Sequence, residues 1–286
     1  MKTNKLLMCT MLIAFCTIWT GCEQEEPQIG PTKSETIPEG FSVSSTKRVQ
    51  FSKGNLCYIN KTLYFLPNQY DFLGTYNFTD GVMDIFCWGS GDDPTGGWDK
   101  YNYNTSFTDW GTNMIYDGTT GNFWSPNCWR TLTQDEWEYL LFSRLNASSL
   151  CGFGTVNGVH GLIIMPDNFT SKALTDIKWC SLEKTKSVGS RGWSDNIYTK
   201  EQWFSLEKED AVFLPAAGSG LYGHQWVYED EVQNWGFYWS STEYEDEYSS
   251  SKARCIGFSC FTADLGGYTA NRYCNCSVRL VKDLKN

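Results

Sequence analysis

The sequence predicts a mixed α+β domain in which short strands and turns outnumber helices. Aromatic residues make up 16% of the 286 residues and 26 residues are glycine, a composition that favours strands joined by tight turns. Only residues 131–144 have the apolar spacing of a clear helix. Several short apolar runs end in Gly or Pro, as buried strands do. We see no internal repeat and expect a single domain over residues 41–286.

The first 21 residues have the pattern of a lipoprotein signal peptide. A positively charged start precedes an apolar run from Leu6 to Trp19, which is too short for an ordinary transmembrane helix. The following Thr20-Gly21-Cys22 resembles the lipobox of bacterial lipoproteins, although Trp19 is bulky for its place there. The resemblance implies that residues 1–21 are removed and that Cys22 carries the lipid, with palmitate among its acyl chains. An ordinary secretory signal peptide is the alternative.

Residues 22–40 are expected to form a flexible tether between the anchor and the domain, because they hold several prolines and little to bury. The acidic run Glu23-Gln24-Glu25-Glu26 resembles the export signal of surface lipoproteins from Gram-negative gut anaerobes. We therefore expect an outer-membrane lipoprotein that is exposed on the cell surface. A merely solvated linker is the alternative interpretation of this run.

The acidic balance of the chain argues against a nucleic-acid partner. The formal net charge is −10, the sequence pI is about 4.8, and no basic patch stands out. The acidity mostly favours solubility. We expect no nucleic-acid binding, and contact with a membrane through the lipid anchor alone.

Twelve cysteines suggest a disulfide framework, but their arithmetic argues against one. Cys9 and Cys16 leave with the signal peptide and Cys22 carries lipid, so twelve minus three leaves nine, an odd number at irregular spacing. A core of this size needs no such crosslinks. We predict buried free thiols beside aromatic side chains, as at Cys87-Trp88 and Cys128-Trp129.

Short strands are expected in the first part of the domain. Phe41-Ser42-Val43-Ser44 alternates between apolar and polar residues, and Val49-Gln50-Phe51-Ser52 has the pattern of a second strand. Residues 56–66 predict a hairpin that turns at Asn60-Lys61. Residues 74–125 are rich in Gly, Asn, Asp and aromatic residues without a sustained period, which predicts long packed loops.

The clear helix begins with a capping box. Thr133 is the predicted N-cap and Glu136 follows three residues later. At helical spacing, one face of this helix is formed by Trp137, Leu140, Leu141 and Arg144. A weaker helix is expected over residues 199–206.

Two further buried strands and a C-terminal strand region complete the expected elements. Residues 156–166 predict a hairpin with its turn at Asn157-Gly158, which makes His160 a strand residue. Residues 211–218 predict a buried strand closed by Pro and Gly. Residues 237–281 are expected to form short strands and turns.

Seven motifs in this order resemble one family. They are Val49–Leu56, Asn68-Gln69-Tyr70-Asp71, Trp129–Trp137, Val156–Pro166, Val212–Gly218, Tyr238-Trp239-Ser240-Ser241 and Ser277-Val278-Arg279-Leu280-Val281. Together they resemble the Fibrobacter-type major paralogous domain of bacterial surface lipoproteins, a family similar to formylglycine-generating enzymes. The resemblance covers nearly all of the chain after the tether. It implies a C-type-lectin-like domain with a distorted antiparallel sheet, flanking helices and long loops.

The segment between the last two motifs is the predicted recognition face. Some proteins with this fold are diversified by retroelements, which place Tyr, Ser, Asp, Gly and Cys in the final coding segment. The same palette occurs here at Arg254, Cys255, Gly257, Ser259, Cys260, Tyr268, Tyr273, Asn275 and Cys276. The apolar alternation of Ala253, Ile256 and Phe258 predicts a half-buried strand with the varied residues facing solvent. Ordinary divergence of a paralogue, without a retroelement, is the alternative.

These features predict a cell-surface ligand-binding protein rather than an enzyme, with a glycan or a protein as ligand. The expected binding residues are Tyr244, Arg254, Cys255, Gly257, Ser259, Tyr268, Tyr273 and Asn275, with Trp226 and His224 beside them. Tyr and Trp anchors on a rigid sheet would supply the affinity. A structural or assembly role at the cell surface is the alternative from another class.

Catalytic and metal chemistry have weaker support. Formylglycine-generating enzymes use a cysteine pair with the spacing of Cys255 and Cys260, which could hold copper(I), but the surrounding Arg- and Gly-rich context is missing. A zinc site with Cys274 and Cys276 needs a longer gap than one residue. No Ser-His-Asp order is found. We expect no catalytic residues and no resident metal.

Two loop features remain as open alternatives. Acidic residues in Gly91–Pro94 and Glu243–Tyr248 could bind calcium, although a solvated loop is the simpler interpretation. Aromatic residues of the long loops could stack on sugar rings but more often belong to a core. These residues are Trp98, Tyr101, Tyr103, Trp110 and Trp124.

Overall fold

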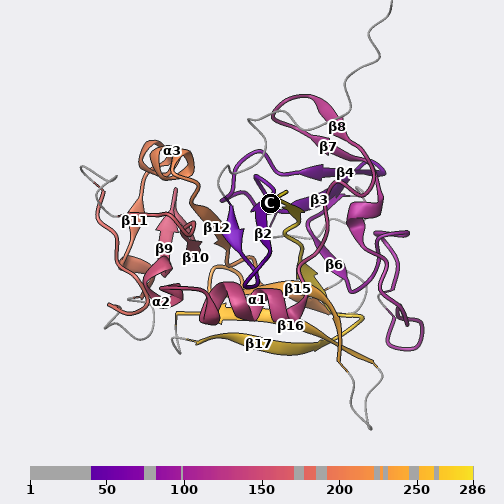
Figure 1. The fold of residues 1–286 in the computed structure, drawn as a ribbon. Helices are drawn as coiled ribbons and strands as arrows, with labels where there is room; N and C mark the ends of the chain where they lie inside the picture. The colour runs from indigo at the N-terminus through magenta and orange to yellow at the C-terminus, as the bar shows by residue number, and fades with distance from the viewer. Residues whose placement is uncertain are drawn as a thin grey trace, which may run out of the picture.

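A computed structural model describes residues 40–73, 82–97, 99–170, 177–184, 192–221, 226–227, 231–244, 251–260 and 264–285. With 14% of residues in helices and 40% in strands, the fold is mixed and strand-rich, as the α+β prediction requires. The strands form several small sheets joined by short helices (Figure 1). In the part of the chain just given, no helix has both the length and the apolar character needed to cross a membrane.

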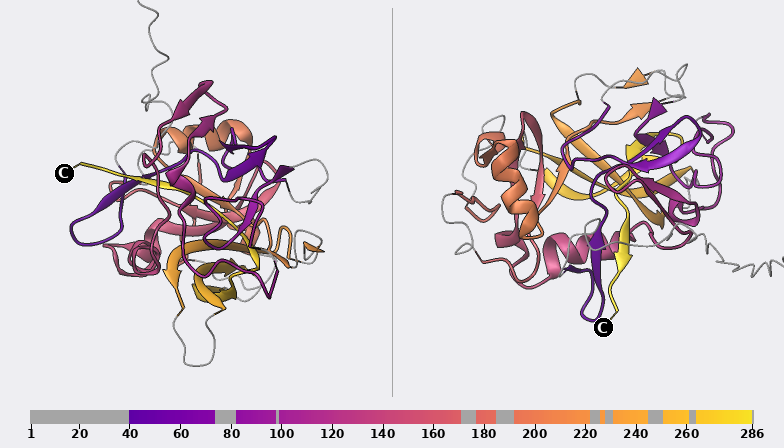
Figure 2. Two further views of the ribbon diagram at one scale, coloured as in Figure 1. Left: turned by 90° about the vertical axis from the view of Figure 1, so that its right-hand side faces the viewer. Right: turned by 90° about the horizontal axis from the view of Figure 1, so that it is seen from above.

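The strands at the two ends of the described domain share one sheet. In the three-stranded sheet, β2 (Arg48–Phe51) lies between β1 (Phe41–Ser42) and β19 (Val281–Asp283), with all neighbours antiparallel. Figure 2 shows the indigo and yellow ends of the chain side by side. The two ends of the domain therefore depend on each other for their hydrogen bonds.

Two further sheets, of five and four strands, lie on either side of this three-stranded sheet. One has the order β5-β3-β4-β7-β8, with β5 (Val82–Met83), β3 (Leu56–Ile59), β4 (Thr62–Phe65), β7 (Ile115–Asp117) and β8 (Asn122–Trp124). The other has the order β11-β9-β10-β12, with β11 (Ile197–Tyr198), β9 (Cys151–Val156), β10 (Val159–Ile164) and β12 (Val212–Pro215). The second sheet packs against α3 (Lys200–Lys208) through a shared hydrophobic cluster.

The largest sheet comes mainly from the C-terminal part of the chain. Its order is β14 (Trp226–Val227), β13 (Gly220–Leu221), β18 (Asn275–Ser277), β15 (Trp235–Glu243), β16 (Lys252–Ser259) and β17 (Asp264–Asn271), and β6 (Ile85–Cys87) also pairs with β18. The helices α1 (Gln134–Glu138), the π-helical η3 (Tyr139–Ser143) and α2 (Ala147–Leu150) follow one another, and α1 lies over β15 and β16 (Figure 1). Two 3-10 turns, η2 (Trp110–Thr112) and η5 (Gly192–Ser194), complete the described helices.

Local sequence chemistry explains most of the turns and caps. Asn60 and Lys61 adopt positive φ angles of 50° and 67° between β3 and β4, as the predicted hairpin requires. Asn157 and Gly158 do the same between β9 and β10. Thr133 and Glu136 form the predicted capping box of α1, and α3 begins with an equivalent box at Thr199. These predictions are confirmed.

Two sequence expectations about strands are wrong. Residues 82–125 contain β5, β6, β7 and β8 rather than loops alone, because strands of two or three residues leave no detectable period. The expectation of short strands over residues 237–281 holds for β18, with three residues, but is wrong for β15, which has nine residues, and for β16 and β17, which have eight each. Both faces of this sheet are covered, so the apolar alternation that marks a one-sided strand is blurred.

The sheet of β15 and β16 separates two hydrophobic clusters. Tyr238, Ile256 and Phe258 point into the first cluster, together with Trp137 of α1. Trp239 and Cys255 point into the second cluster. Side chains alternate between the two sides, as the strand period of two requires.

The nine cysteines of the domain are free thiols, as predicted from their odd number. Cys87 and Cys255 are fully buried, whereas Cys128 is partly exposed. Burial raises the pKa of the Cys57 thiol to about 12, so this thiol stays protonated at neutral pH. The thiols behave as small apolar side chains of the core.

A buried polar network, which we call the brace, joins five of the seven sequence motifs. Arg279 donates to Asn55 Oδ1 (3.1 Å), to the Lys53 carbonyl (2.9 Å) and to Gln69 Oε1 (2.8 Å). Asn55 Nδ2 donates to the Tyr238 hydroxyl (3.0 Å), which donates to the Pro215 carbonyl (3.0 Å). The motif residues that the sequence singles out are thus held together inside the domain, where they fix the relative positions of its sheets.

Candidate ligand-binding site

The site is built around the start of α1. Trp137 is fully buried and anchors the helix on the sheet, while Asp135 and Glu138 on the opposite side are exposed. The acidic first turn, with Asp135 and Glu136, also stabilises the helix because the N-terminal end of its dipole is positive. The first turn of α1 therefore presents carboxylates to solvent at a fixed position.

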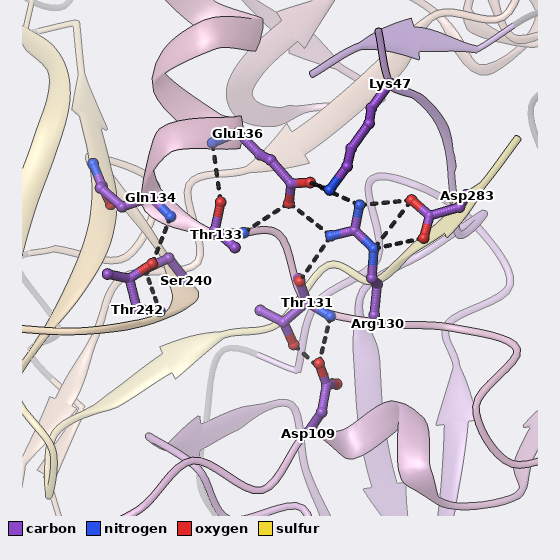
Figure 3. Close-up of polar contacts among 10 residues, drawn as sticks. All are labelled: Lys47, Asp109, Arg130, Thr131, Thr133, Gln134, Glu136, Ser240, Thr242 and Asp283. Carbon is purple, nitrogen blue, oxygen red and sulfur yellow. Dashed lines mark hydrogen bonds and ion pairs between the residues drawn. The ribbon is translucent and has the colours of Figure 1, made fainter. Parts of the chain in front are cut away.

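An ion-pair network fixes this helix start against the last strand. Arg130 binds Glu136 (2.6 and 2.9 Å) and Asp283 of β19 (2.6 to 3.1 Å), and Lys47 lies 3.9 Å from Glu136 (Figure 3). The hydrogen bonds from Arg130 lower the pKa of Asp283. Burial raises the pKa of Asp109, whose carboxylate accepts from the backbone and side chain of Thr131. Each of these groups has a partner within the fold, so we assign the network a structural role.

An irregularity in β15 turns its end toward the helix. The pairing of β15 with β16 is broken between Trp239 and Glu243. The Ser241 amide instead donates to the Leu132 carbonyl (2.9 Å), and Thr242 Oγ1 accepts from the Gln134 amide (2.9 Å), as Figure 3 shows for Gln134 and Thr242. Such bulges redirect side chains. Here the bulge brings Thr242 and Glu243 beside the first turn of α1.

The result is an open polar depression, which we call the shelf, with a volume of about 600 Å³. It is lined by Gln134, Asp135, Glu138, Thr242, Glu243 and Arg254. Gln134 Nε2 donates to Glu138 Oε1 (2.9 Å). Gly267 of β17 leaves room for this pair, because a Cβ atom there would lie 2.3 Å from Gln134 Nε2. Three carboxylates, one guanidinium, one amide and one hydroxyl offer both donors and acceptors to a ligand.

Arg254 is the one cation among these lining residues. Its guanidinium lies 4.6 Å from the centre of the Tyr244 ring. Within the part of the chain that the structure describes, this guanidinium has no hydrogen bond and no ion pair. Glu243, by contrast, is held by Arg272 Nη2 at 3.1 Å, and Arg272 itself stacks on Trp88 at 4.4 Å. The shelf thus combines fixed carboxylates with a guanidinium whose donors are unused.

The structure brings Tyr244 and Arg254 together, as the sequence predicts for a common face. The expectation that the varied residues all face solvent is wrong for Cys255, Gly257, Ser259 and Asn275, which are buried, as are Cys260 and Cys276. The reason is that β16 and β18 lie inside the sheet with packed residues on both sides. A Cβ on Gly257 would meet the rings of Tyr268 and Phe237 at 2.8 and 3.0 Å.

The remaining predicted residues do not join the shelf. Tyr268 lies opposite Cys255 in β17 and packs against Phe237 (6.2 Å between ring centres) on the side of the sheet away from α1. Tyr273 packs against Tyr103, with ring centres 6.4 Å apart. The backbone of Trp226 forms part of β14, and nothing is described of its side chain. His224 and the lipidation residue Cys22 lie outside the described residues.

Sequence reasoning missed most of the shelf. The predicted helix is recognised by its apolar face, whereas the shelf uses its polar residues Gln134, Asp135 and Glu138. Thr242 directly follows the Tyr-Trp-Ser-Ser motif. The sequence pattern places Glu243 in an acidic loop. The available signal was the polar face of the capped helix, but its partner strand lies about a hundred residues away in the sequence, as the 108-residue separation of Gln134 and Thr242 illustrates.

Among the described residues, the thiol and calcium alternatives receive no geometric support, and residues 245–248 of the second acidic loop lie outside that part of the chain. Cys255 and Cys260 lie in different hydrophobic clusters on opposite sides of the sheet, and burial raises the pKa of Cys260 to about 12. Among the described residues, no group of three or more His, Cys, Asp or Glu is arranged to hold a metal ion. Asp93 and Asp99 instead accept hydrogen bonds from Thr95 and Tyr101 in their own loop.

The aromatic loop residues are divided between core and surface. Trp110 and Trp124 are fully buried and belong to the second cluster, whereas Tyr101 is 83% exposed. Tyr103 is partly exposed, and Trp98 lies outside the described residues. His160 is a strand residue, as predicted, with its ring stacked on Trp193 and its Nδ1 2.7 Å from the Gln233 carbonyl. The tryptophans of this loop region thus act mainly as core.

One family model matches part of the chain. A family model described as a domain of unknown function, DUF8237, matches residues 168–281, less than half of the chain. The match includes Thr242, Glu243 and Arg254 of the shelf and excludes α1. No curated protein and no solved structure matches the chain.

Proposed function

We propose that this protein is anchored by lipid at the cell surface, has a C-type-lectin-like domain and binds a glycan or protein ligand on the shelf. The stacking of Arg254 on Tyr244 is the observation that carries the proposal. An arginine whose donors have no partner among the described residues, on a sheet beside fixed carboxylates, is prepared to bind a polar ligand without reorganisation. The lipid anchor at Cys22 is supported by the lipobox-like sequence alone.

Binding fits this surface better than catalysis does. The shelf offers donors and acceptors of both signs, but no pair of groups in it forms a nucleophile and base in mutual contact. Glu243 and Glu138 each already accept a hydrogen bond from a neighbouring side chain. Such oriented carboxylates are suited to accept further hydrogen bonds from ligand hydroxyl or amide groups. We infer that the site recognises and does not transform its ligand.

The test is a glycan and surface-protein array probed with residues 23–286. The shelf variant is Tyr244→Ala/Arg254→Ala. The matched control is Lys100→Ala/Tyr101→Ala, because Lys100 also lies 4.6 Å over a tyrosine ring, in an exposed loop away from the shelf. We expect binding that the control keeps and the shelf variant loses by at least about tenfold. Equal binding by both variants would move the site elsewhere, and no binding by any form would favour the structural or assembly role.

Surface anchoring has its own test. Cells producing the full chain are treated with a protease that cannot cross the outer membrane, with Cys22→Ser as the comparison. We expect the natural chain to be membrane-bound and cleaved on intact cells, and the variant to lose its membrane association. A natural chain that fractionates without the membrane would contradict the lipid anchor.

A further inference from the structure

A second cavity lies at the other end of the molecule from the shelf. It has a volume of about 240 Å³ and is formed between α3 and the loop that carries Tyr70. In Figure 1, α3 lies at the top left while β16 and β17 lie at the bottom. The cavity is therefore separate from the shelf, and its occupation would not depend on the function proposed there.

Three of the seven residues that line the cavity are aromatic. Tyr70 and Trp203 are almost fully buried and give the wall a fixed shape. Phe204 at the rim is 54% exposed, although an apolar ring of this size is normally buried. The Phe204 ring already attracts one cation, because Lys208 Nζ lies 4.4 Å from its centre. The electron-rich faces of such rings stabilise ammonium groups.

Carboxylates give the cavity a negative potential. Glu201 and Glu207 line it, and Asp71 follows Tyr70 directly. The pKa of Tyr70 is raised mainly by burial and further by these three carboxylates, as expected for a hydroxyl in a negative field. Lys200 is the one lining residue of opposite charge. Two negative groups and one positive group in the lining leave a net charge of −1.

We propose that this cavity binds an organic ammonium group, held by the aromatic wall and by Glu201 and Glu207. Aromatic faces attract a cation and carboxylates neutralise it, whereas an anion would be repelled by the same groups. The volume suits a head group with a few carbons rather than a sugar chain. The ammonium can be that of a free small molecule or that of a lysine side chain in a peptide.

The first experiment compares a cation with its neutral isostere on the mature chain. Choline is titrated against 3,3-dimethyl-1-butanol, which has the same shape without the charge, and binding is followed by calorimetry. A small ligand in an open cavity should bind with a dissociation constant in roughly the millimolar range. We expect choline to bind at least about tenfold more tightly than the neutral alcohol. Equal binding of the two, or no binding of any ammonium probe, would overturn the proposal.

Variants of opposite charge test the location. Phe204→Ala and Glu207→Gln should each weaken choline binding by about three- to tenfold, and Lys200→Gln should strengthen it by about two- to fivefold. Glu209→Gln, at the end of the same helix and outside the cavity, is the charge control. Phe142→Ala is the aromatic control, because Phe142 is 51% exposed elsewhere. Loss of choline binding in either control variant, or weaker choline binding by the Lys200→Gln variant, would contradict this site.

The source of the ammonium is settled by a second pair of probes. N-acetyl-lysine methylamide carries the lysine side chain in a peptide setting, and its Nζ-acetylated form is the uncharged control. Tighter binding of the lysine probe than of choline identifies a peptide ligand, and the reverse identifies a free quaternary ammonium. The Tyr244→Ala/Arg254→Ala variant should bind both probes unchanged, so that failure of the shelf and failure of this cavity are distinguishable.

Discussion

Two arginines show how differently two regions of this domain use the same side chain. Arg279 in the brace is fully buried, contacts only neutral oxygen atoms, and has its pKa lowered to about 10 by burial. Arg254 on the shelf is partly exposed and stacks on Tyr244 with its donors unused. The first arginine is committed to the fold. The second remains available to a ligand.

The difference explains why the C-terminal sequence is regular at its ends and mixed between them. Tyr238 and Arg279, which flank the mixed segment, both belong to the brace. The residues between them follow strand geometry, but only some reach solvent, since β16 lies inside the sheet. In the function proposed above, recognition is therefore confined to a few positions such as Arg254, which lines the shelf.

The largest effect should follow from removing Arg279. The Arg279→Ala change leaves the Lys53 carbonyl and the Asn55 amide oxygen without their donor and opens a cavity. We expect the free energy of unfolding to fall by about 3–5 kcal/mol, measured by urea denaturation. Arg279→Lys should lose less, because it keeps one donor group. A loss below about 1 kcal/mol for the alanine variant would show that the hydrogen bonds of the brace do not stabilise the fold as one network.

Asp84 should make the free energy of unfolding depend on pH. Burial raises the pKa of Asp84 to about 6, although its carboxylate accepts from the Leu73 amide. The protonated form is favoured in the folded state, so this stabilisation is fully present below about pH 4 and is lost as pH rises through about 6. We expect the loss to be about 2–3 kcal/mol and to be absent in Asp84→Asn. Parallel stability curves for the two proteins between pH 4 and 7 would refute it.

A substitution at Gly257 tests whether this position is buried, as in the structure, or belongs to the exposed face that the sequence predicts. The Gly257→Ala change places a Cβ within about 3 Å of the Tyr268 and Phe237 rings, so overpacking should lower the free energy of unfolding by about 1–3 kcal/mol. Gly118→Ala is the control, because the nearest atom to its Cβ would lie 3.8 Å away. Thermal melting of both variants decides the matter. Equal melting temperatures would show that position 257 has room for a side chain, as the predicted exposed face requires.

The smallest stability effect is expected for Arg254. Because, among the described residues, its guanidinium makes only the stacking contact with Tyr244, Arg254→Ala should change the free energy of unfolding by no more than about 0.5 kcal/mol. Urea denaturation beside Arg279→Ala provides the direct comparison. A loss of 2 kcal/mol or more, on the order of a buried group, would mean that Arg254 supports the fold and would weaken its assignment to the shelf.

Much of the fold follows from local sequence, and much of the site does not. The turn at Asn60-Lys61, the capping box at Thr133 and the strand of residues 212–215 were predictable because each depends on a few neighbouring residues. The shelf was not, because Gln134 meets Thr242 and Gly267 only after α1 settles on the sheet. Of the predicted binding residues whose side chains the structure describes, only Tyr244 and Arg254 meet beside it.

The sequence by itself determined the helix caps, the hairpin turns and the presence of at least one unpaired cysteine, since short-range geometry and the parity of a count suffice for these. Tertiary structure alone decided which residues of the C-terminal segment face solvent. A strand presents its side chains to two sides alternately, but the sequence does not say what covers each side. Here α1 covers one side and the second hydrophobic cluster the other, so that Cys255 and Ser259 are buried while Arg254 remains in reach of a ligand.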